Sequence, residues 1–200
     1  MEAFESFVAV AIESENFVVS PAVKFNVKLK TKKAAYDEFQ SHGYEVDLVG
    51  ARADRLVLAT VKSFFGSRGV VAEHVTGDSS NERWNKLYAL LNNKDIRSQV
   101  ITDAAARYGY ETDQVQLRLY VGRFAAPTRG SHEAAIREWA DHQHVGVGPI
   151  KVYGLDDVVD MVRDAAEHKQ YRDDPVLVTM KVLQAAGQLK PRTSAGQQAH

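Results

Sequence analysis

Asp47 and Lys62 are the two residues whose types and spacing point most directly to chemistry. They lie in two apolar segments that a short turn around Ala53 and Asp54 separates. If this turn closes a β-hairpin, Asp47 lies opposite Thr60, and directly opposed residues share one face of a sheet. We therefore expect the Asp47 carboxylate, the Thr60 hydroxyl and the Lys62 ammonium to project from the same side.

This group of side chains has a use in phosphodiester hydrolysis. Glu45, two residues before Asp47, is expected to join the group. Carboxylates bind Mg²⁺ or Mn²⁺ through hard oxygen ligands, the metal activates water, and a lysine orients that water or neutralises charge. The alternative is an ordinary cross-strand ion pair between Asp47 and Lys62, worth roughly 0.2 to 1 kcal/mol.

The elements that must position these residues follow from the apolar patterns. Phe4, Phe7, Val8, Ala11 and Ile12 have helical spacing, which predicts a helix over the first 15 residues. Alternation from Val23 to Leu29 predicts a half-exposed strand. The segment 55–63 is apolar on both faces, which predicts a buried central strand. The expected elements are a helix at 1–15, strands at 17–30, 44–50 and 55–63, and a loop or short helix at 31–42.

The second half of the chain alternates helical and extended patterns. We expect Trp84, Tyr88 and Leu91 to anchor a helix to the core. The stretch from Val70 to His74 either extends the third strand or forms a short strand of its own. The remaining predictions are helices at 81–91 and 96–108, a strand at 114–124, a helix from 131, a strand at 150–153, and helices at 155–166 and 175–186. The sequence thus predicts one domain over 1–188 and a polar, disordered tail over 189–200.

Composition narrows the classes of function. The 200 residues suit one compact α/β domain, and a net charge of −1 gives no global basic field, so a nucleic acid must be met by a local patch. Cysteine is absent, which excludes disulfides and thiolate chemistry. No run approaches the roughly 18 apolar residues of a membrane span, and we expect a cytoplasmic protein without membrane contact.

The order of elements around the hairpin resembles a known family. A helix, a strand, and then the segments Tyr44-Glu45-Val46-Asp47-Leu48-Val49 and Leu56-Val57-Leu58-Ala59-Thr60-Val61-Lys62-Ser63 are similar to the core of the PD-(D/E)xK nucleases. The resemblance covers about residues 1–63. It implies a restriction-endonuclease-like fold, in which helices flank a central mixed β-sheet, and a Mg²⁺- or Mn²⁺-dependent nuclease acting on DNA.

The resemblance also assigns roles to individual residues. Asp47 matches the aspartate that ends one strand of the family's motif, Lys62 matches its lysine, and Glu5 matches a metal-binding glutamate of the first helix. Thr60 occupies the acid position of acid-x-lysine, which removes one metal-binding charge. Glu45, Glu5 or Glu73 could substitute for it, because the family tolerates migration of this acid.

Three further features are candidates for binding nucleic acid. A basic run near the hairpin could contact a phosphate backbone, although lysines also protect exposed strand edges. Ser67 and Arg68 lie in a glycine-flanked loop after Lys62. Gln99 lies on a helix where some relatives of this family place a glutamine near the site, and its ordinary role would be capping or solvation. The basic run comprises Lys24, Lys28, Lys30, Lys32 and Lys33.

The sequence leaves three functions open. The first is a metal-dependent DNA nuclease, and the second is a module of the same fold that has lost catalysis at Thr60 and binds nucleic acid or a protein partner. The third is an unrelated α/β domain whose hairpin carries an incidental ion pair. A homodimer is expected by analogy with enzymes that cut two strands. His142 and His144 have no nearby cluster of ligands, which favours a surface role.

Overall fold

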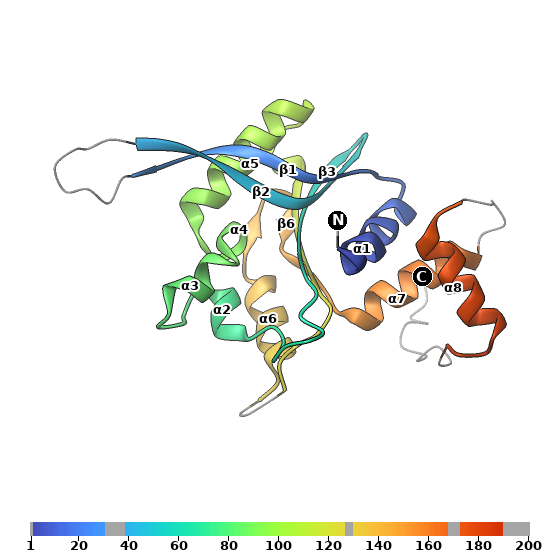
Figure 1. Ribbon diagram of the computed structural model, residues 1–200. Helices are drawn as coiled ribbons and strands as arrows, with labels where there is room; N and C mark the ends of the chain where they lie inside the picture. The colour runs from blue at the N-terminus through green and yellow to red at the C-terminus, as the bar shows by residue number, and fades with distance from the viewer. Residues whose placement is uncertain (1, 31–38, 127–129, 168–172, 190–200) are drawn as a thin grey trace.

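The computed structural model describes residues 2–30, 39–126, 130–167 and 173–189. These residues form an α/β structure in which helices flank a five-stranded mixed sheet (Figure 1). The first elements are α1 (Ala3–Ser14), β1 (Val18–Lys30), β2 (Phe39–Arg52) and β3 (Arg55–Lys62). The middle elements are α2 (Ala72–Thr76), α3 (Glu82–Lys86), α4 (Ala89–Asn92), α5 (Lys94–Tyr108), a 3₁₀ turn at Thr112–Gln114 and β4 (Val115–Val121). The last are α6 (His132–Asp141), β5 (His144–Val145), β6 (Gly148–Pro149), β7 (Lys151–Tyr153), α7 (Leu155–Glu167) and α8 (Pro175–Ala185).

The main sheet has the order β1-β2-β3-β4-β7. The first three strands are antiparallel neighbours, whereas β4 pairs with β3, and β7 with β4, in parallel. A parallel pair needs a crossover, and the segment from α2 to α5 supplies it between β3 and β4. The strand β3 is therefore central, which explains why it is apolar on both faces.

Two hydrophobic cores lie on the two faces of the sheet. One contains Leu56 and Leu58 of β3 and packs beneath α4, α5 and α6, and the other contains Val57 and Ala59 and packs beneath α1, α7 and α8. Figure 1 shows the same division, with the blue helix α1 and the orange and red helices α7 and α8 on one side of the sheet. Alternate residues of one strand thus serve different cores.

The β1–β2 ribbon bends at Ala22 and Asp47. The paired register of the two strands omits these two residues, and Ala22 has a positive φ of 52°. On the β2 side of the bend, Val46 packs into the core beneath α5, whereas Leu48 packs into the core beneath α1. The outer half of the ribbon therefore crosses α5, as Figure 1 shows, while its inner half continues the sheet.

Several sequence predictions are confirmed and others need correction. The hairpin and its register are confirmed as far as Leu48 opposite Ala59. The loop predicted up to His42 is wrong at its end, because β2 already begins at Phe39. This extension lies on the solvent-exposed outer ribbon, where polar residues are compatible with a strand, so local polarity misplaced the boundary.

The single helix predicted over 81–91 is also wrong. The structure divides it into α3 and α4, and Trp84 is 42% exposed instead of buried. Its ring stacks on His74, with 5.2 Å between ring centroids, while Tyr88 and Leu91 are buried as predicted. Val70 makes one isolated β-bridge with Phe124, and the residues from Ala72 onward form α2 instead of a strand.

Two other predictions concern the ends and the membrane. The tail predicted over 189–200 lies outside the described residues except for Leu189, as do Lys32 and Lys33 of the basic run. Within the described part of the chain, no helix is both long enough and apolar enough to cross a membrane.

Candidate functional site

Asp47 lies where β2 and β3 separate. One carboxylate oxygen, Oδ2, accepts a hydrogen bond of 2.7 Å from the backbone N–H of Val61, and the Lys62 ammonium lies 3.5 Å from the same oxygen. The side chains of Asp47 and Lys62 are 24% and 20% exposed. The Asp47 carboxylate thus accepts the Val61 N–H in place of a backbone carbonyl of a neighbouring strand. This hydrogen bond fixes the carboxylate beside the Lys62 ammonium.

A pocket of about 580 Å³ opens at this point of the sheet. It is lined by Asp47 from β2, Lys62 from β3 and Glu5 from α1, together with Ser67 from the loop that follows β3. The structure therefore brings together four of the residues that the sequence singles out, from three elements and one loop.

The amino-terminal end of α1 forms one wall of the pocket. The Glu5 carboxylate accepts a hydrogen bond of 2.9 Å from the backbone N–H of Glu2, as in a capping box that satisfies the free donors of a helix start. The Phe4 ring packs edge-to-face on Phe65, with centroids 5.3 Å apart. This contact ties α1 to the loop after β3 and so positions Glu5 near Lys62.

The other wall is the loop after β3, which has a constrained backbone. Phe64, two residues after Lys62, has a φ of 46°, which is unusual for a residue with a side chain. A Cβ on Gly122, directly after β4, would lie 2.6 Å from the Ser63 carbonyl oxygen, so only glycine allows this close approach. Phe64 lines the pocket, and backbone outliers of this kind often cluster at functional sites.

Glu2 and Ser63 line the pocket without having been singled out from the sequence. The Ser63 hydroxyl lies 3.5 Å from the Glu2 carboxylate. The sequence contained an indication for each of these two residues. Glu2 precedes Glu5 at capping-box spacing, and Ser63 directly follows Lys62.

Glu45 and Thr60 do not line this pocket. Glu45 lies 3.7 Å from Lys24 on β1, directly across the ribbon, in a solvent-exposed ion pair. The bend at Asp47 separates it from the pocket, so the expected same-side placement with Asp47 does not hold. Thr60 is buried, with 6% exposure, on a strand covered on both sides.

Gln99 lies at the edge of the sheet instead of in the pocket. Its side-chain amide accepts a hydrogen bond from the Lys28 N–H at 2.8 Å and donates one to the Lys28 carbonyl at 3.2 Å. Asp103, one turn later on α5, accepts from the Asn26 N–H, and Arg107 donates to the Lys24 carbonyl. The helix α5 thus covers the outer edge of β1.

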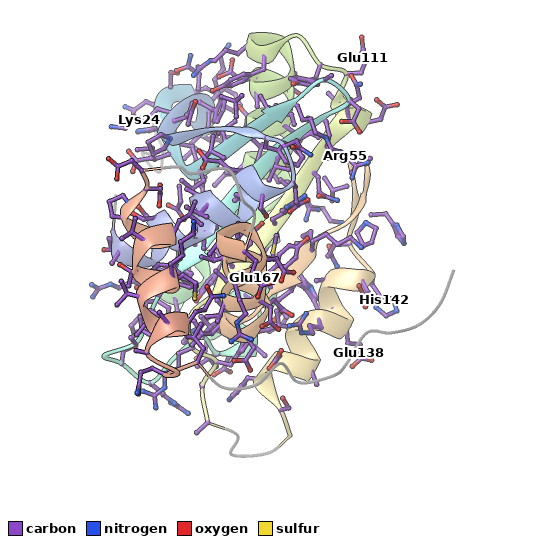
Figure 2. All side chains as sticks on the ribbon, turned by 90° about the vertical axis from the view of Figure 1, so that its right-hand side faces the viewer. Lys24, Arg55, Glu111, Glu138, His142 and Glu167 are labelled. Atoms are coloured by element: carbon purple, nitrogen blue, oxygen red, sulfur yellow. The ribbon has the colours of Figure 1, made fainter. Side chains whose placement is uncertain are left out.

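The remaining candidates lie on the surface. Lys24, Lys28 and Lys30 are exposed on β1, and Arg68 is exposed in the loop next to Ser67. Figure 2 shows Lys24 at the end of the molecule away from Glu138 and His142 on α6. The His142 ring lies 2.7 Å from the Glu138 carbonyl through Nδ1, and both His142 and His144 are exposed.

Three carboxylates of the described residues line the pocket and are the candidate ligands for a divalent metal. Glu2, Glu5 and Asp47 line the pocket, and one oxygen of each already accepts a hydrogen bond or an ion pair. No group of three or more His, Cys, Asp or Glu residues in the described ranges is arranged to hold a metal ion. Mg²⁺ is commonly bound through only one or two carboxylates, with water and substrate phosphate completing its shell, and Glu5 and Asp47 are two pocket carboxylates that would fill this role.

No model of a protein family matches the sequence, and no curated protein matches it either.

Proposed function

We propose that the chain has a restriction-endonuclease-like core and is a Mg²⁺- or Mn²⁺-dependent nuclease that hydrolyses DNA phosphodiester bonds. The observation that carries this proposal is that Asp47, Lys62 and Glu5, from three different elements, line one pocket. The helix and the three antiparallel strands at the start of the chain support it, because the sequence resemblance rests on that order, and the mixed sheet flanked by helices is the architecture that the resemblance implies.

Asp47 and Glu5 are the residues that would hold the metal in this proposal. The metal would polarise the phosphodiester and lower the pKa of the attacking water. Asp47 is already fixed by the Val61 N–H, so little side-chain freedom is lost when its other oxygen binds a ligand.

Lys62 neutralises charge at the phosphate and orients the attacking water. Its contact with Asp47 keeps the Lys62 ammonium beside the carboxylate, and in this position the ammonium can donate a hydrogen bond to a phosphate oxygen. Ser67 lines the same pocket and can donate a hydrogen bond to a second phosphate oxygen. These roles require DNA to approach along the loop after β3.

A second candidate function is a binding module of the same fold without catalysis. The burial of Thr60 favours it, because a neutral, covered side chain stands where the family places a metal-binding acid. In this case Lys62 and Ser67 bind phosphate without hydrolysis. Homodimer formation belongs to the nuclease proposal, since cutting two strands commonly uses two copies.

Cleavage assays distinguish the two candidates. Single-stranded, duplex and branched DNA are incubated with wild-type protein and Mg²⁺ or Mn²⁺, and with Asp47→Asn and Lys62→Met. We expect metal-dependent cutting by the wild type and a loss of about 100-fold or more in each variant, as for groups that act on the reacting atoms. Glu45→Gln is the matched control on the same strand, and it should cut like the wild type because Glu45 pairs with Lys24 outside the pocket.

The outcomes separate fold, catalysis and binding. Equal cutting by wild type and Asp47→Asn contradicts the nuclease proposal. An inert wild type that binds DNA, with binding weakened in Lys62→Met, supports the binding module. Thr60→Glu, checked for folding by its melting temperature, would then be expected to gain metal-dependent cutting if only the missing acid prevents catalysis.

A further inference from the structure

A second pocket, of about 450 Å³, lies between α5 and the β5–β6 turn. The described residues that line it all differ from those that line the pocket of Asp47 and Lys62. Among the described residues, its polar lining is rich in hydrogen-bond donors and contains a single carboxylate. These residues include Lys94, Arg97, Ser98, Thr102, Asp113 and His144.

Arg97 is the unusual residue of this pocket, because it is a buried cation without an acidic partner among the described residues. The residue is only 8% exposed. Its Nη1 donates a 2.7 Å hydrogen bond to the Leu91 carbonyl at the end of α4. Among the described residues, no carboxylate lies within ion-pair distance of its guanidinium, whereas the other strongly buried arginines, Arg118 and Arg163, each have one.

The Arg97 side chain lines the pocket. Among the described residues, its hydrogen bond to the Leu91 carbonyl uses one of the three guanidinium nitrogens. Burial lowers the pKa of Arg97 because desolvation disfavours the charged form. A buried charge is costly unless it is paired, and an anion in the pocket would supply the missing partner.

The wall opposite α5 is held firmly in place. Gly146, in the turn between β5 and β6, has a φ of 61°, and a Cβ there would lie 1.9 Å from the Val115 carbonyl oxygen. The same carbonyl accepts a hydrogen bond of 3.0 Å from the Val147 N–H. The turn that carries His144 and Val145 to the pocket is therefore packed directly on the start of β4.

We propose that this pocket binds a phosphate-bearing small molecule. Arg97 and Lys94 pair with the phosphate, and the hydroxyls of Ser98 and Thr102 donate to its remaining oxygens. Phosphate suits this lining because its several oxygens can accept from a guanidinium fork and hydroxyls at once. Asp113, the only acid of the lining, accepts from a sugar hydroxyl, and the volume lies within the range of small-molecule sites.

The test is calorimetric titration of the full chain with inorganic phosphate and with adenosine 5′-monophosphate, using adenosine and sodium chloride of matched ionic strength as controls. We expect both phosphates to bind and adenosine to bind much more weakly. Arg97→Met should weaken phosphate binding by about tenfold or more, since hydrogen bonds to a charged group are lost. Lys94→Ala, at an exposed position, should weaken it by a smaller factor.

Two variants guard against nonspecific effects. Lys151→Ala removes the same charge from β7, outside the pocket, and should bind phosphate like the wild type. Asp113→Asn should bind inorganic phosphate at least as tightly as the wild type, because a repulsive charge is removed. If Arg97→Met does not fold, Lys94→Ala and Asp113→Asn decide. The absence of phosphate binding at millimolar concentration, or an equal loss in Lys94→Ala and Lys151→Ala, would overturn the proposal.

Discussion

Asp47 carries two roles at the scale of a single residue. Its carboxylate satisfies the Val61 N–H at the point where β2 leaves β3, and it lies beside Lys62 in the pocket. An asparagine keeps an oxygen that can accept the same hydrogen bond, whereas an alanine leaves the Val61 N–H without it. Asp47→Asn is therefore the variant that separates the chemistry of the carboxylate from its structural role.

Arg118 shows how a charge is accommodated within this fold. Its side chain is 3% exposed, and its guanidinium donates to both Glu15 oxygens at 2.5 and 2.9 Å, to Gln116 and to the Tyr120 hydroxyl. Burial by itself lowers the pKa of Arg118, but the hydrogen bonds to Glu15 together with the interactions with Tyr120 and Tyr153 outweigh it, and the net pKa is raised. The pair joins the carboxyl-terminal end of α1 to β4.

We predict that Glu15→Gln destabilises the protein strongly. It leaves the Arg118 charge buried without its counter-ion, and breaking such a pair typically costs about 3 to 5 kcal/mol of unfolding free energy. The double variant Glu15→Gln with Arg118→Met should be less destabilised than the sum of the two single variants, because no unpaired charge remains. Urea unfolding measures all three values, and strict additivity would contradict the coupling.

At the scale of elements, α5 protects the outer edge of β1. Gln99, Asp103 and Arg107 follow one another at intervals of four along the helix and satisfy backbone groups of Lys28, Asn26 and Lys24. A free strand edge invites pairing with other chains. Covering it with side chains of a helix is one way to prevent this association.

This arrangement gives a matched pair of variants for hydrogen exchange. Asp103→Ala should speed exchange of the Asn26 amide, and Gln99→Ala that of the Lys28 amide, because each loses its acceptor. One hydrogen bond of about 1 kcal/mol corresponds to roughly fivefold faster exchange. Each variant is the control for the other, and equal acceleration at both amides would indicate general loosening of the helix instead of local loss.

At the scale of the whole molecule, the net charge of −1 requires DNA to meet a local basic surface. Lys28 on the outer ribbon and Arg68 beside the pocket are exposed candidates. Lys24 is less available, since it pairs with Glu45. The nuclease and the binding module share this requirement, so it can be tested without catalysis.

We predict a shallow salt dependence for duplex binding. Each phosphate contact contributes about 0.9 to the slope of log affinity against log salt, and Lys28→Ala should reduce that slope by about 1. Fluorescence anisotropy at several salt concentrations measures it. Lys151→Ala, on the strand at the far side of the sheet, should leave the slope unchanged, and a steep slope that Lys28→Ala does not alter would exclude this surface.

Much of the fold could be predicted because the patterns are local. The alternation over β1, the turn at Ala53 and Asp54, and the doubly apolar β3 correctly indicate a hairpin beside a central strand. The register followed from the turn alone, because side chains in a strand repeat every two residues. The same local patterns indicate an α/β architecture with a central sheet flanked by helices.

The site could be predicted only in part. Asp47, Lys62, Glu5 and Ser67 meet in one pocket as the sequence suggests, whereas Glu45 does not. The prediction for Glu45 assumed a regular strand, and the bend at Ala22 and Asp47 breaks that regularity. Trp84 at helical spacing suggested a core position, but α3 packs against other helices in a way that leaves the ring exposed against His74.

The sequence by itself determined the elements, the hairpin and the residue types available for chemistry, because these depend on neighbours within one or two turns of chain. The tertiary structure decided which side chains meet. The start of α1 reaches the loop after β3 through the contact of Phe4 with Phe65, and Arg97 is buried, with no acidic partner among the described residues, where α5 lies beside the β5–β6 turn. Such contacts join residues far apart in sequence, and only the packing of whole elements brings them together.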